Sequence, residues 1–439
     1  MKDIGIKNII TGIFVIAAIA AFMVFSGVIN IGSQSAQVSG QVTVWGTIPF
    51  STIQQYIDQA KEQNLTINYV EKKPLTYEDE LINSFASGTG PDLFIMSHEG
   101  ILRHSDKILE IPYESFPRSS YEQAYVDEAR LFLSDTGVRA FPITVDPMIM
   151  YYNKALISSA FVLDVPEYWD EFPSFANQVT QYSGTGEIII SAAALGTFDN
   201  IPSAKNIITA LIMQNKNNII SVDPTTKKNR SILSFDEDQI QRTIQAMDFY
   251  TSFARFGSNT YSWNEALVDS KNKFISGDLA IHFGLGSEAQ DIRRKNPNLD
   301  FGVALFPQVR DNTLRSTHGA MTGIAIAKQS KNIPASINVA SKIAGSVIAD
   351  GLANDLNVAP ARKDLLRDKP DDAFRTLIYN SAIISRGWID ADPDATNELF
   401  SELVRNINTG ALSTRDAISR ANADLNTILN RTINTTLGN

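Results

Sequence analysis

The chain has 439 residues, of which 44% are hydrophobic and 20% charged, and its formal net charge is -10. One hydrophobic core rarely grows beyond roughly 250–300 residues, so we expect at least two lobes. The acidic balance argues against a nucleic-acid partner, because phosphate binding needs a basic surface. The sequence has no cysteine, which excludes disulfides, thiolate metal sites, thiol catalysis and a lipid-modified cysteine. Its histidines show no metal-binding spacing, and we expect neither a metal nor a cofactor.

The N-terminus carries a strong targeting signal. Residues 9–29 are uncharged and mostly apolar, and at ~1.5 Å per residue they can cross a hydrocarbon core of ~30 Å. Lys2 and Lys7 precede this run, so the positive-inside rule places residues 1–8 in the cytoplasm. We expect a retained single-pass anchor in the cell membrane, with the soluble part on the extracytoplasmic side. The alternative is a cleaved signal peptide.

Residues 30–40 are small and polar, which is typical of a flexible linker. After it, apolar strand patterns alternate with amphipathic helix patterns. The segment Ser87-Gly88-Thr89-Gly90-Pro91 predicts a helix stop, and Asp92 is expected to hydrogen-bond at the start of the next strand. This alternation indicates an α/β lobe with a parallel sheet. The predicted elements are strands at 42–45, 66–71 and 92–96 and helices at 53–63 and 77–86.

The rhythm changes at 141–153, FPITVDPMIMYYN, which is rich in strand-forming residues. Beyond it the pattern is mostly helical, with short apolar strands between the helices. Trp169 opens a helix and is expected to pack in a core. The later predicted elements are strands at 187–191, 279–283, 301–305 and 323–327 and helices at 334–348, 394–408 and 413–429.

Eight segments stand out when the chain is taken in order. They are VTVWGT (42–47), FASGTGPDLF (85–94), FPITVDPMIMYYNKAL (141–156), VPEYWDEF (165–172), FISGDLAIHFG (274–284), NLDFGVALFPQ (298–308), AIAKQSKN (325–332) and APARKDLL (359–366). Together, and in this order, they resemble the family of extracellular solute-binding proteins that serve ABC sugar importers. The resemblance covers residues 41–430.

The resemblance implies an α/β, two-lobed periplasmic-binding-protein-like fold with hinge crossovers. The uncharged run at 9–29 adds one N-terminal transmembrane helix before this fold. The resemblance also implies a non-enzymatic protein that captures a small polar solute, by default a carbohydrate, through hinge closure. The partner would be the transmembrane subunits of an ABC permease. The sequence departs from the family at 282–287 and 319–322, where the tryptophans of many sugar binders are missing. The implied lobes are 41–145 plus 318–375 and 150–315 plus 380–435, with crossovers near 143–150, 310–318 and 375–380.

In open α/β sheets, ligands bind beyond the carboxyl ends of the strands. That rule selects Trp45 and Thr47 after the first strand, and Ser97 and Glu99 after the strand at 92–96. Aromatic faces and hydroxyl or carboxyl oxygens suit a polar solute. For Trp45 the alternative is core packing, and for Ser97 it is the capping of a short helix.

Four further candidates lie later in the chain. Asp146 stands in an apolar strand, where a charge needs a partner or a ligand, and the resembled family places a cleft acid there. The alternative for Asp146 is a structural hydrogen bond. Tyr151 is a second candidate, although alternation leaves open whether it or Tyr152 faces the core. Trp263 and Trp388 lie on connections and are candidate stacking residues, with core packing as the alternative.

Two other functions remain open from the sequence. A secreted glycan-acting enzyme would need two convergent carboxylates. The chain has 48 Asp and Glu residues, so a count of acids does not exclude such an enzyme. The sequence lacks a G-x-S-x-G elbow and a phosphate loop, and we expect no catalytic residue. A surface sensor or adhesin built on the same lobes is the third interpretation.

Overall fold

The structure, a computed structural model, describes residues 39–62, 64–226, 228–368 and 370–437. The predicted anchor at 9–29 and nearly all of the linker at 30–40 therefore lie outside the described residues. Among those described, no helix is long and apolar enough to span a membrane.

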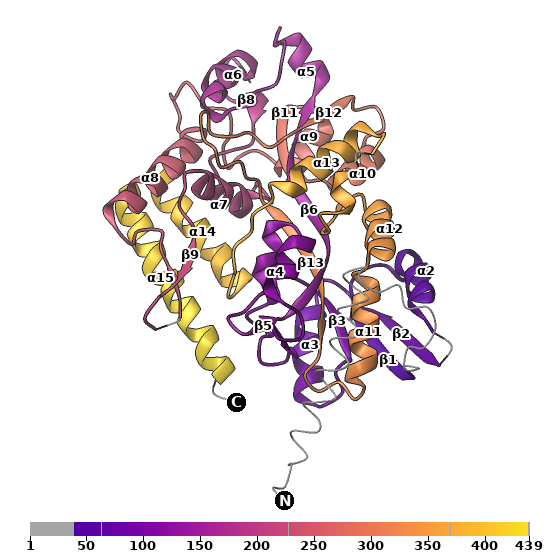
Figure 1. Cartoon of the computed structure of the whole chain (residues 1–439). Helices are drawn as coiled ribbons and strands as arrows, with labels where there is room; N and C mark the ends of the chain where they lie inside the picture. Colours follow the sequence, from indigo (N-terminus) through magenta and orange to yellow (C-terminus); the bar gives the residue numbers. More distant parts are fainter. Residues whose placement is uncertain (1–38, 63, 227, 369, 438–439) are drawn as a thin grey trace, which may run out of the picture. The chain divides into compact units, whose positions relative to one another are not determined.

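The chain divides into two compact units (Figure 1). Of the described residues, unit 1 contains those up to Val145 and those between Met321 and Lys369, and unit 2 contains those between Asp146 and Ala320 and those from Pro370 onward. The chain therefore passes from one unit to the other three times.

Two short stretches expected in lobe one, residues 318–320 and 370–375, belong to unit 2. The physical reason lies in their contacts. The carbonyl of His318 accepts a hydrogen bond from the amide of Met148, and the helix that begins at Ala373 packs against a strand of unit 2.

The core of unit 1 is a mainly parallel sheet. The central strand pairs in parallel with a strand on each side, and a later strand joins the sheet antiparallel. The predicted strand positions in this region are confirmed. The strands are β1 (Gly40–Gly46), β2 (Leu65–Glu71), β3 (Leu93–Ser97), β13 (Gly319–Ile326) and β14 (Ala359–Pro360), which pairs with the first half of β6 (Ala140–Asn153).

Asp92 fixes the start of β3, as expected. Its Oδ2 accepts a hydrogen bond from the Thr43 amide at 2.9 Å. Its Oδ1 accepts from the Ser330 hydroxyl at 2.7 Å and from the Lys331 amide at 3.2 Å. One carboxylate thereby joins β1, β3 and the segment after β13.

Helices cover this sheet, with α2 packing on β2 and α11 on β1. The first turn of the helix α3 contains Glu78, Asp79 and Glu80, whose charges suit the positive end of a helix. The helix is capped by Ser87, which is followed by Gly88 in the left-handed region at φ 70°, so the predicted stop is confirmed. The helices are α2 (Phe50–Ala60), α3 (Tyr77–Ala86), α4 (Arg118–Ala124), α11 (Ile333–Ile343) and α12 (Ser346–Leu356).

The single helix predicted at 334–348 is wrong, because the segment forms α11 and α12 with a break between them. Gly345 caps α12 with an extended backbone, φ -70° and ψ 160°. A Cβ at this position would lie 2.9 Å from the carbonyl oxygen of Lys342. The close approach of backbone to backbone therefore requires glycine.

Several short elements complete unit 1. They are the 3-10 helices η1 (His98–Gly100), η2 (Asp127–Phe132) and η4 (Leu365–Arg367) and the paired strands β4 (Ile111–Pro112) and β5 (Gly137–Val138).

Unit 2 is built on the second half of β6. That half pairs antiparallel with one strand on each side, and a further strand continues the sheet in parallel. A separate two-stranded hairpin lies outside this sheet. The strands are β7 (Gln181–Tyr182), β8 (Ile188–Ala193), β11 (Leu279–Leu285) and β12 (Phe301–Ala304), with β9 (Ile220–Val222) and β10 (Asn229–Ser231) in the hairpin.

Trp169, on the 3-10 helix η3 (Trp169–Glu171), lies at the centre of an aromatic core in unit 2. Its indole Nε1 donates to the Gln214 side-chain oxygen at 2.6 Å. The expectation that it packs in a core is confirmed. The surrounding rings, with centroids 5.0–5.6 Å away, are Phe172, Phe249, Phe283 and Phe306.

The helices of unit 2 begin largely at Asn or Asp caps, whose side-chain oxygens accept from the first free amides. The helices α8, α14 and α15 lie side by side (Figure 1). The full set is α5 (Lys154–Ser159), α6 (Phe172–Val179), α7 (Ala204–Gln214), α8 (Glu237–Ser252), α9 (Ser270–Ser276), α10 (Glu288–Lys295), α13 (Ala373–Ile383), α14 (Pro393–Asn408) and α15 (Thr414–Leu437).

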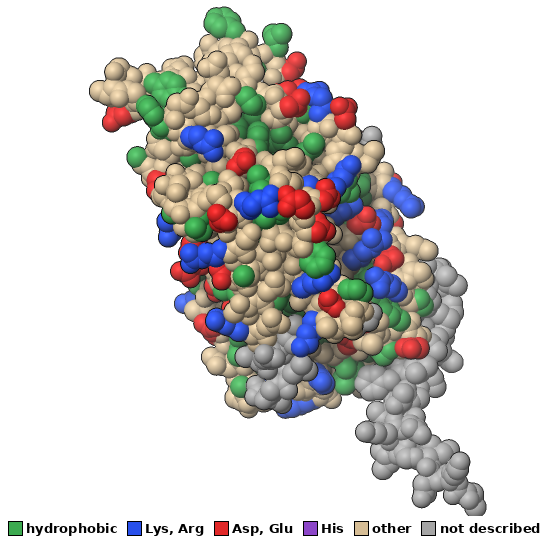
Figure 2. Space-filling view, turned by 90° about the vertical axis from the view of Figure 1, so that its left-hand side faces the viewer, with side chains coloured by type: hydrophobic (Ala, Val, Ile, Leu, Met, Phe, Trp, Pro, Cys, Tyr) green, Lys and Arg blue, Asp and Glu red, His purple; other side chains and the backbone are tan. Residues whose placement is uncertain are grey.

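The surface carries charges of both signs. On the face shown in Figure 2, basic and acidic side chains are interspersed among the coloured residues, without a patch of a single sign. This face offers no basic stripe of the kind that tracks a phosphate backbone.

Candidate functional site

Unit 1 contains a hollow of about 270 Å³ at the carboxyl ends of β1 and β3, which we call the unit 1 pocket. Its wall brings together two predicted site residues, Thr47 and Ser97, from two neighbouring parallel strands. The volume falls just below the roughly 300–1,000 Å³ typical of ligand pockets, which suits one part of a solute. The lining residues are Thr47, Ile48, Pro74, Tyr77, Glu78, Ile95, Met96, Ser97, Ile143, Thr144, Thr322, Leu352 and Leu356.

The lining combines hydroxyls with an apolar floor. Thr47 and Thr322 are partly exposed, Ser97 is exposed and Thr144 is buried. Buried aliphatic side chains such as Leu352 are also part of the lining. A few placed polar groups on an apolar surface are what a polar solute with C–H faces requires.

One carboxylate, that of Glu78, lines the unit 1 pocket. Its Oε2 lies 2.5 Å from Nε2 of His104, whose side chain is 1% exposed. Burial alone would raise the pKa of Glu78, but the hydrogen bond and charge interaction with His104 lower it below its usual value. Glu78 is therefore ionised at neutral pH.

Tyr77 fixes the two strand ends that form the pocket wall. Its hydroxyl donates to the carbonyl oxygen of Ile95 at 2.9 Å and is 3.2 Å from that of Trp45. Burial raises the pKa of Tyr77 well above its usual value, so the hydroxyl remains a donor. The ends of β1 and β3 are thereby held in fixed register.

Residues in and beside this wall have structural contacts. The Ser97 hydroxyl accepts a hydrogen bond from the Glu99 amide at 3.3 Å, so the capping alternative for Ser97 is confirmed. Glu99 is partly exposed and is not part of the pocket lining. Trp45 is partly buried, and Nζ of Lys72 lies 3.7 Å from its ring centroid.

Asp146 is the first residue of unit 2. Its Oδ1 accepts a hydrogen bond from the backbone amide of Ser287 at 3.1 Å. Burial raises the pKa of Asp146 to about 7, against the hydrogen bonds from Ser287 and with the help of the nearby Glu288 charge. The structural role of Asp146 thus has a defined partner, the amide of Ser287. Contact between Asp146 and a ligand stays a prediction.

Tyr151 lies in the interior of unit 2. Its hydroxyl donates to the carbonyl oxygens of Leu285 at 2.6 Å and Gly286 at 3.0 Å, and its side chain is 0% exposed. Tyr152, by contrast, is partly exposed. The structure therefore makes Tyr151 a support for the loop after β11.

Trp263 and Trp388 are also buried in unit 2. Nε1 of Trp263 donates to the side-chain oxygen of Asn200 at 3.0 Å, and its side chain is 0% exposed. The ring of Trp388 packs edge-on against Phe400. Both placements favour the core-packing alternative, because stacking needs an open ring face.

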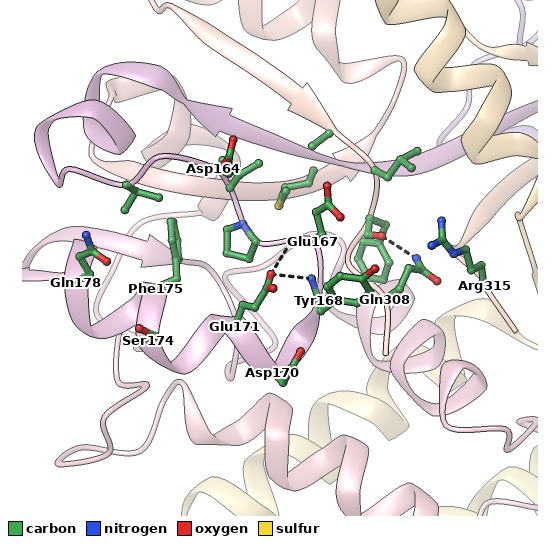
Figure 3. Close-up of a pocket in the computed structure, with 17 residues that line it drawn as sticks. Asp164, Glu167, Tyr168, Asp170, Glu171, Ser174, Phe175, Gln178, Gln308 and Arg315 are labelled. Atoms are coloured by element: carbon green, nitrogen blue, oxygen red, sulfur yellow. Dashed lines mark hydrogen bonds between the residues drawn. The ribbon is translucent and has the colours of Figure 1, made fainter. Parts of the chain in front are cut away.

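A larger hollow, of about 930 Å³, lies in unit 2 (Figure 3). Asp164, Glu167, Asp170 and Glu171 lie on its wall, together with the cation of Arg315. Oε2 of Glu171 accepts hydrogen bonds from the backbone amides of Glu167 and Tyr168. Its Oε1 forms an ion pair with Arg310. None of the predicted site residues lines this hollow.

Sequence reasoning missed Glu78, Thr144 and Thr322. A signal for Glu78 was present: a helix that follows a parallel strand starts at the carboxyl edge of the sheet, and α3 follows β2. Thr144 and Thr322 lie inside strands, so only the three-dimensional register reveals that they face the pocket. Within the described part of the chain, no cluster of acidic or histidine side chains could hold a metal ion.

Comparison with known proteins gives weak but extended similarity. A binding protein of Brucella abortus (strain 2308) is 22% identical over 279 residues, 62% of this chain and 63% of that protein. The chain thus spans less than two thirds of that relative. A maltotriose-binding protein of Pyrococcus abyssi is 27% identical over 139 residues, 30% of this chain and 29% of that protein.

Solved structures share the fold. A cyclo/maltodextrin-binding protein complexed with maltotetraose has a TM-score of 0.71 at 14% identity, covering 92% of this chain and 99% of that one. A maltose-binding periplasmic protein from Listeria monocytogenes in complex with maltose has a TM-score of 0.68 at 13% identity, covering 89% and 98%. The fold is thus α/β, two-lobed and of the periplasmic-binding-protein type.

The sequence model of one protein family matches most of this chain. The model, for the bacterial extracellular solute-binding proteins, aligns with residues 55–372, which include most of the unit 1 pocket lining and the crossover at Val145. The chain belongs to the bacterial extracellular solute-binding protein family.

Proposed function

We propose that this chain is the extracytoplasmic solute-binding protein of an ABC importer. It captures a small polar solute, a sugar or an oligosaccharide, and delivers it to the transmembrane subunits of a permease. The observation that carries the proposal is the unit 1 pocket, where hydroxyls and one carboxylate meet an apolar floor at the carboxyl ends of β1 and β3.

A carbohydrate fits this lining. Sugar hydroxyls exchange hydrogen bonds with Thr47, Thr322 and the Glu78 carboxylate, while C–H faces contact the aliphatic floor. One relative named as a maltotriose-binding protein, and similar structures that hold maltose or maltotetraose, support this solute class. Of the other sequence-predicted residues, Ser97, Glu99 and Asp146 remain proposed contacts.

We propose hinge closure as the mechanism. The chain passes between the units at 145–146, 320–321 and 369–370, and such short connections can act as hinges. A solute shifts the population only if it binds one arrangement of the units more tightly than the other. A compact, solute-bound form is then the species that a permease recognises.

Two other functions are less well supported. A glycan hydrolase needs two carboxylates that converge on one bond, whereas the described lining of the unit 1 pocket offers Glu78 alone, already paired with His104. A sensor or adhesin would use the same pocket without a permease. Genes for two permease subunits beside this one would favour the importer.

A ligand screen tests the proposal. The full chain, purified in detergent, is tested by thermal shift against neutral oligosaccharides, polyols and peptides, and positives are confirmed by calorimetry. A solute at 100 times its dissociation constant adds about 2.7 kcal/mol to stability. Binding of a peptide but of no carbohydrate would reject the sugar class, and steady release of a cleaved glycan would reject a binding-only role. Small-angle scattering at saturation should show a smaller radius of gyration.

We also propose that residues 9–29 anchor the protein in the membrane, on the basis of the uncharged run that follows Lys2 and Lys7. Intact-mass spectrometry of the protein from native membranes tests this. Retention of the N-terminal residues supports the anchor, and a mature N-terminus near Gln37 contradicts it.

A further inference from the structure

The carboxylate of Glu78 has one bonded oxygen and one open oxygen. Oε2 lies 2.5 Å from Nε2 of His104. Oε1 has no hydrogen-bond partner among the described residues, and it is not one of the buried polar atoms that lack a partner there, so solvent reaches it. The side chain is 38% exposed and lines the unit 1 pocket. Oε1 is therefore the oxygen of Glu78 that remains available to a solute.

The ring of His104 is fixed in the interior of unit 1. Its side chain is 1% exposed, and the ring packs edge-on to Phe94 with centroids 6.0 Å apart. The backbone amide of His104 donates to the carbonyl oxygen of Gly100 at 3.1 Å, which fixes the main chain at this position. His104 is not part of the pocket lining. It can therefore influence a bound solute only through a neighbouring side chain, and Glu78 is such a side chain.

The bond between His104 and Glu78 determines which carboxylate oxygen stays open. Burial alone would raise the pKa of Glu78, but the interactions with His104 lower it, so the carboxylate is ionised and the histidine is the donor. The bond needs only a hydrogen on Nε2, which the imidazolium and one neutral tautomer both carry. An unbonded glutamate side chain samples several rotamers. Engaging Oε2 therefore gives Oε1 a defined position, whichever of these two forms His104 takes.

The open oxygen of Glu78 differs from the other polar groups of the lining. Lining hydroxyls such as those of Thr47 and Thr322 can donate or accept a hydrogen bond, whereas an ionised carboxylate only accepts. A hydrogen bond to a charged acceptor is also roughly twice as strong as a neutral one. Oε1 therefore favours a solute that brings an O–H or N–H group to this point.

We propose that His104 is a positioning residue for solute binding, because it holds Oε2 of Glu78 and so presents Oε1 as the fixed acceptor for one hydroxyl of the solute. A side chain that is ordered before binding loses less conformational freedom when the solute arrives, and this raises the affinity. His104 thus contributes to binding without touching the solute. The contact of Glu78 with a solute rests on the proposed function, whereas the hold of His104 on Glu78 does not.

The hold on Glu78 is measured first, without any solute. The full chain is labelled with ¹³C in the glutamate carboxyl groups, and the Glu78 signal is identified by its loss in Glu78→Ala. In His104→Leu, burial acts without the bond, so we expect the pKa of Glu78 to lie above its value in the wild type. His104→Gln keeps a neutral N–H donor, and the pKa of Glu78 in this variant should lie between the other two. An unchanged pKa in His104→Leu would overturn the inference, whatever solute the protein binds.

The effect on a solute is then measured as the coupling between the two residues, with maltotriose as the probe and calorimetry as the readout. We expect His104→Leu to weaken binding about ten-fold when Glu78 is present, and less than about two-fold in a chain that already carries Glu78→Ala. His104→Gln should restore the affinity to within about three-fold of the wild type. Equal losses in both backgrounds would show that His104 acts on the pocket as a whole, and this would overturn its positioning role.

The matched control is Ile101→Val, which trims a fully buried side chain in the same segment, 101–107, and leaves the bond between His104 and Glu78 in place. We expect its effect on maltotriose binding to be the same with and without Glu78→Ala. A coupling as large as that of His104→Leu would contradict the specific role of the histidine. Failure of maltotriose to bind the wild type counts against the carbohydrate class of the proposed function, and the carboxyl measurement then decides whether His104 holds Glu78.

Discussion

Oδ1 of Asp146 lies 3.1 Å from the backbone nitrogen of Ser287, so the first residue of unit 2 accepts a hydrogen bond from the loop that follows β11. Gly286, in the same loop, donates its amide to the carbonyl of Pro147 at 3.0 Å. A Cβ on Gly286 would lie 2.4 Å from Cδ1 of Ile378. The loop is thus held against the start of unit 2, and Asp146 is part of that support.

The raised pKa of Asp146 predicts a specific pH dependence. Its folded pKa, about 7, exceeds the ordinary 3.8, so its contribution is fully present below about pH 4 and is lost as the pH rises towards 7. Asp146→Asn mimics the protonated form and keeps an acceptor for Ser287. We expect the variant to be more stable than wild type at pH 8, by at most about 4 kcal/mol, and equal to it near pH 4. Urea unfolding across this range measures the difference, and a gap that does not vary with pH would contradict the assignment.

Asp146→Ala separates the two roles of this residue. Near pH 4, where Asp146 is protonated in the folded protein, loss of the acceptor for Ser287 should cost about 1–3 kcal/mol of unfolding free energy. If Asp146 also contacts the solute, binding of maltotriose should weaken by roughly 10- to 150-fold. Calorimetry on the alanine and asparagine variants distinguishes these effects. Unchanged affinity with lowered stability would leave Asp146 a purely structural residue.

Tyr151→Phe tests the support of the loop from the other side. The substitution removes one buried hydroxyl that serves two carbonyl oxygens, those of Leu285 and Gly286. We expect a loss of about 1–3 kcal/mol in unfolding free energy. The matched control is Tyr152→Phe, which removes the same atom from a partly exposed ring and should have little effect. Equal losses in both variants would argue against the specific role of Tyr151.

The ion pair of Lys205 and Asp390, with nitrogen and oxygen 3.0 Å apart, is largely enclosed in unit 2. Lys205→Met removes the cation that lies 3.0 Å from the Asp390 carboxylate, whose side chain is 1% exposed. Breaking such a pair from one side costs about 3–5 kcal/mol. The exposed pair of Arg415 and Glu237 provides the contrast, because solvent screens it. Chemical denaturation should show a large loss for Lys205→Met and no measurable change for Arg415→Met.

Much of the fold followed from local patterns in the sequence. The stop at Ser87–Pro91 and the role of Asp92 depend on residues close in the chain, and both were predictable. The break between α11 and α12 was not, because Gly345 is only one glycine in an otherwise helical pattern.

The candidate site was harder to predict for a physical reason. Thr47 and Ser97 follow strands directly, so the strand-end rule found them. Thr144 and Thr322 line the unit 1 pocket because their strands pair with segments far away in the sequence, at Pro360 and Ser97 respectively. No local sequence pattern reveals such pairing. Trp263 looked accessible because it lies on a connection, yet the connection folds inward and its indole bonds to Asn200.

The three passages of the chain between the units have a consequence for biogenesis. In unit 1, the amide of Met321 bonds to Nδ1 of His98, 223 residues earlier in the sequence, and β13 pairs with β3. The sheet of unit 1 therefore lacks a strand until all of unit 2 up to Ala320 has been synthesised. Such distant pairings fold slowly. Neither unit of a nascent chain can therefore be completed early, because unit 1 awaits β13 and unit 2 awaits the residues that follow Pro370.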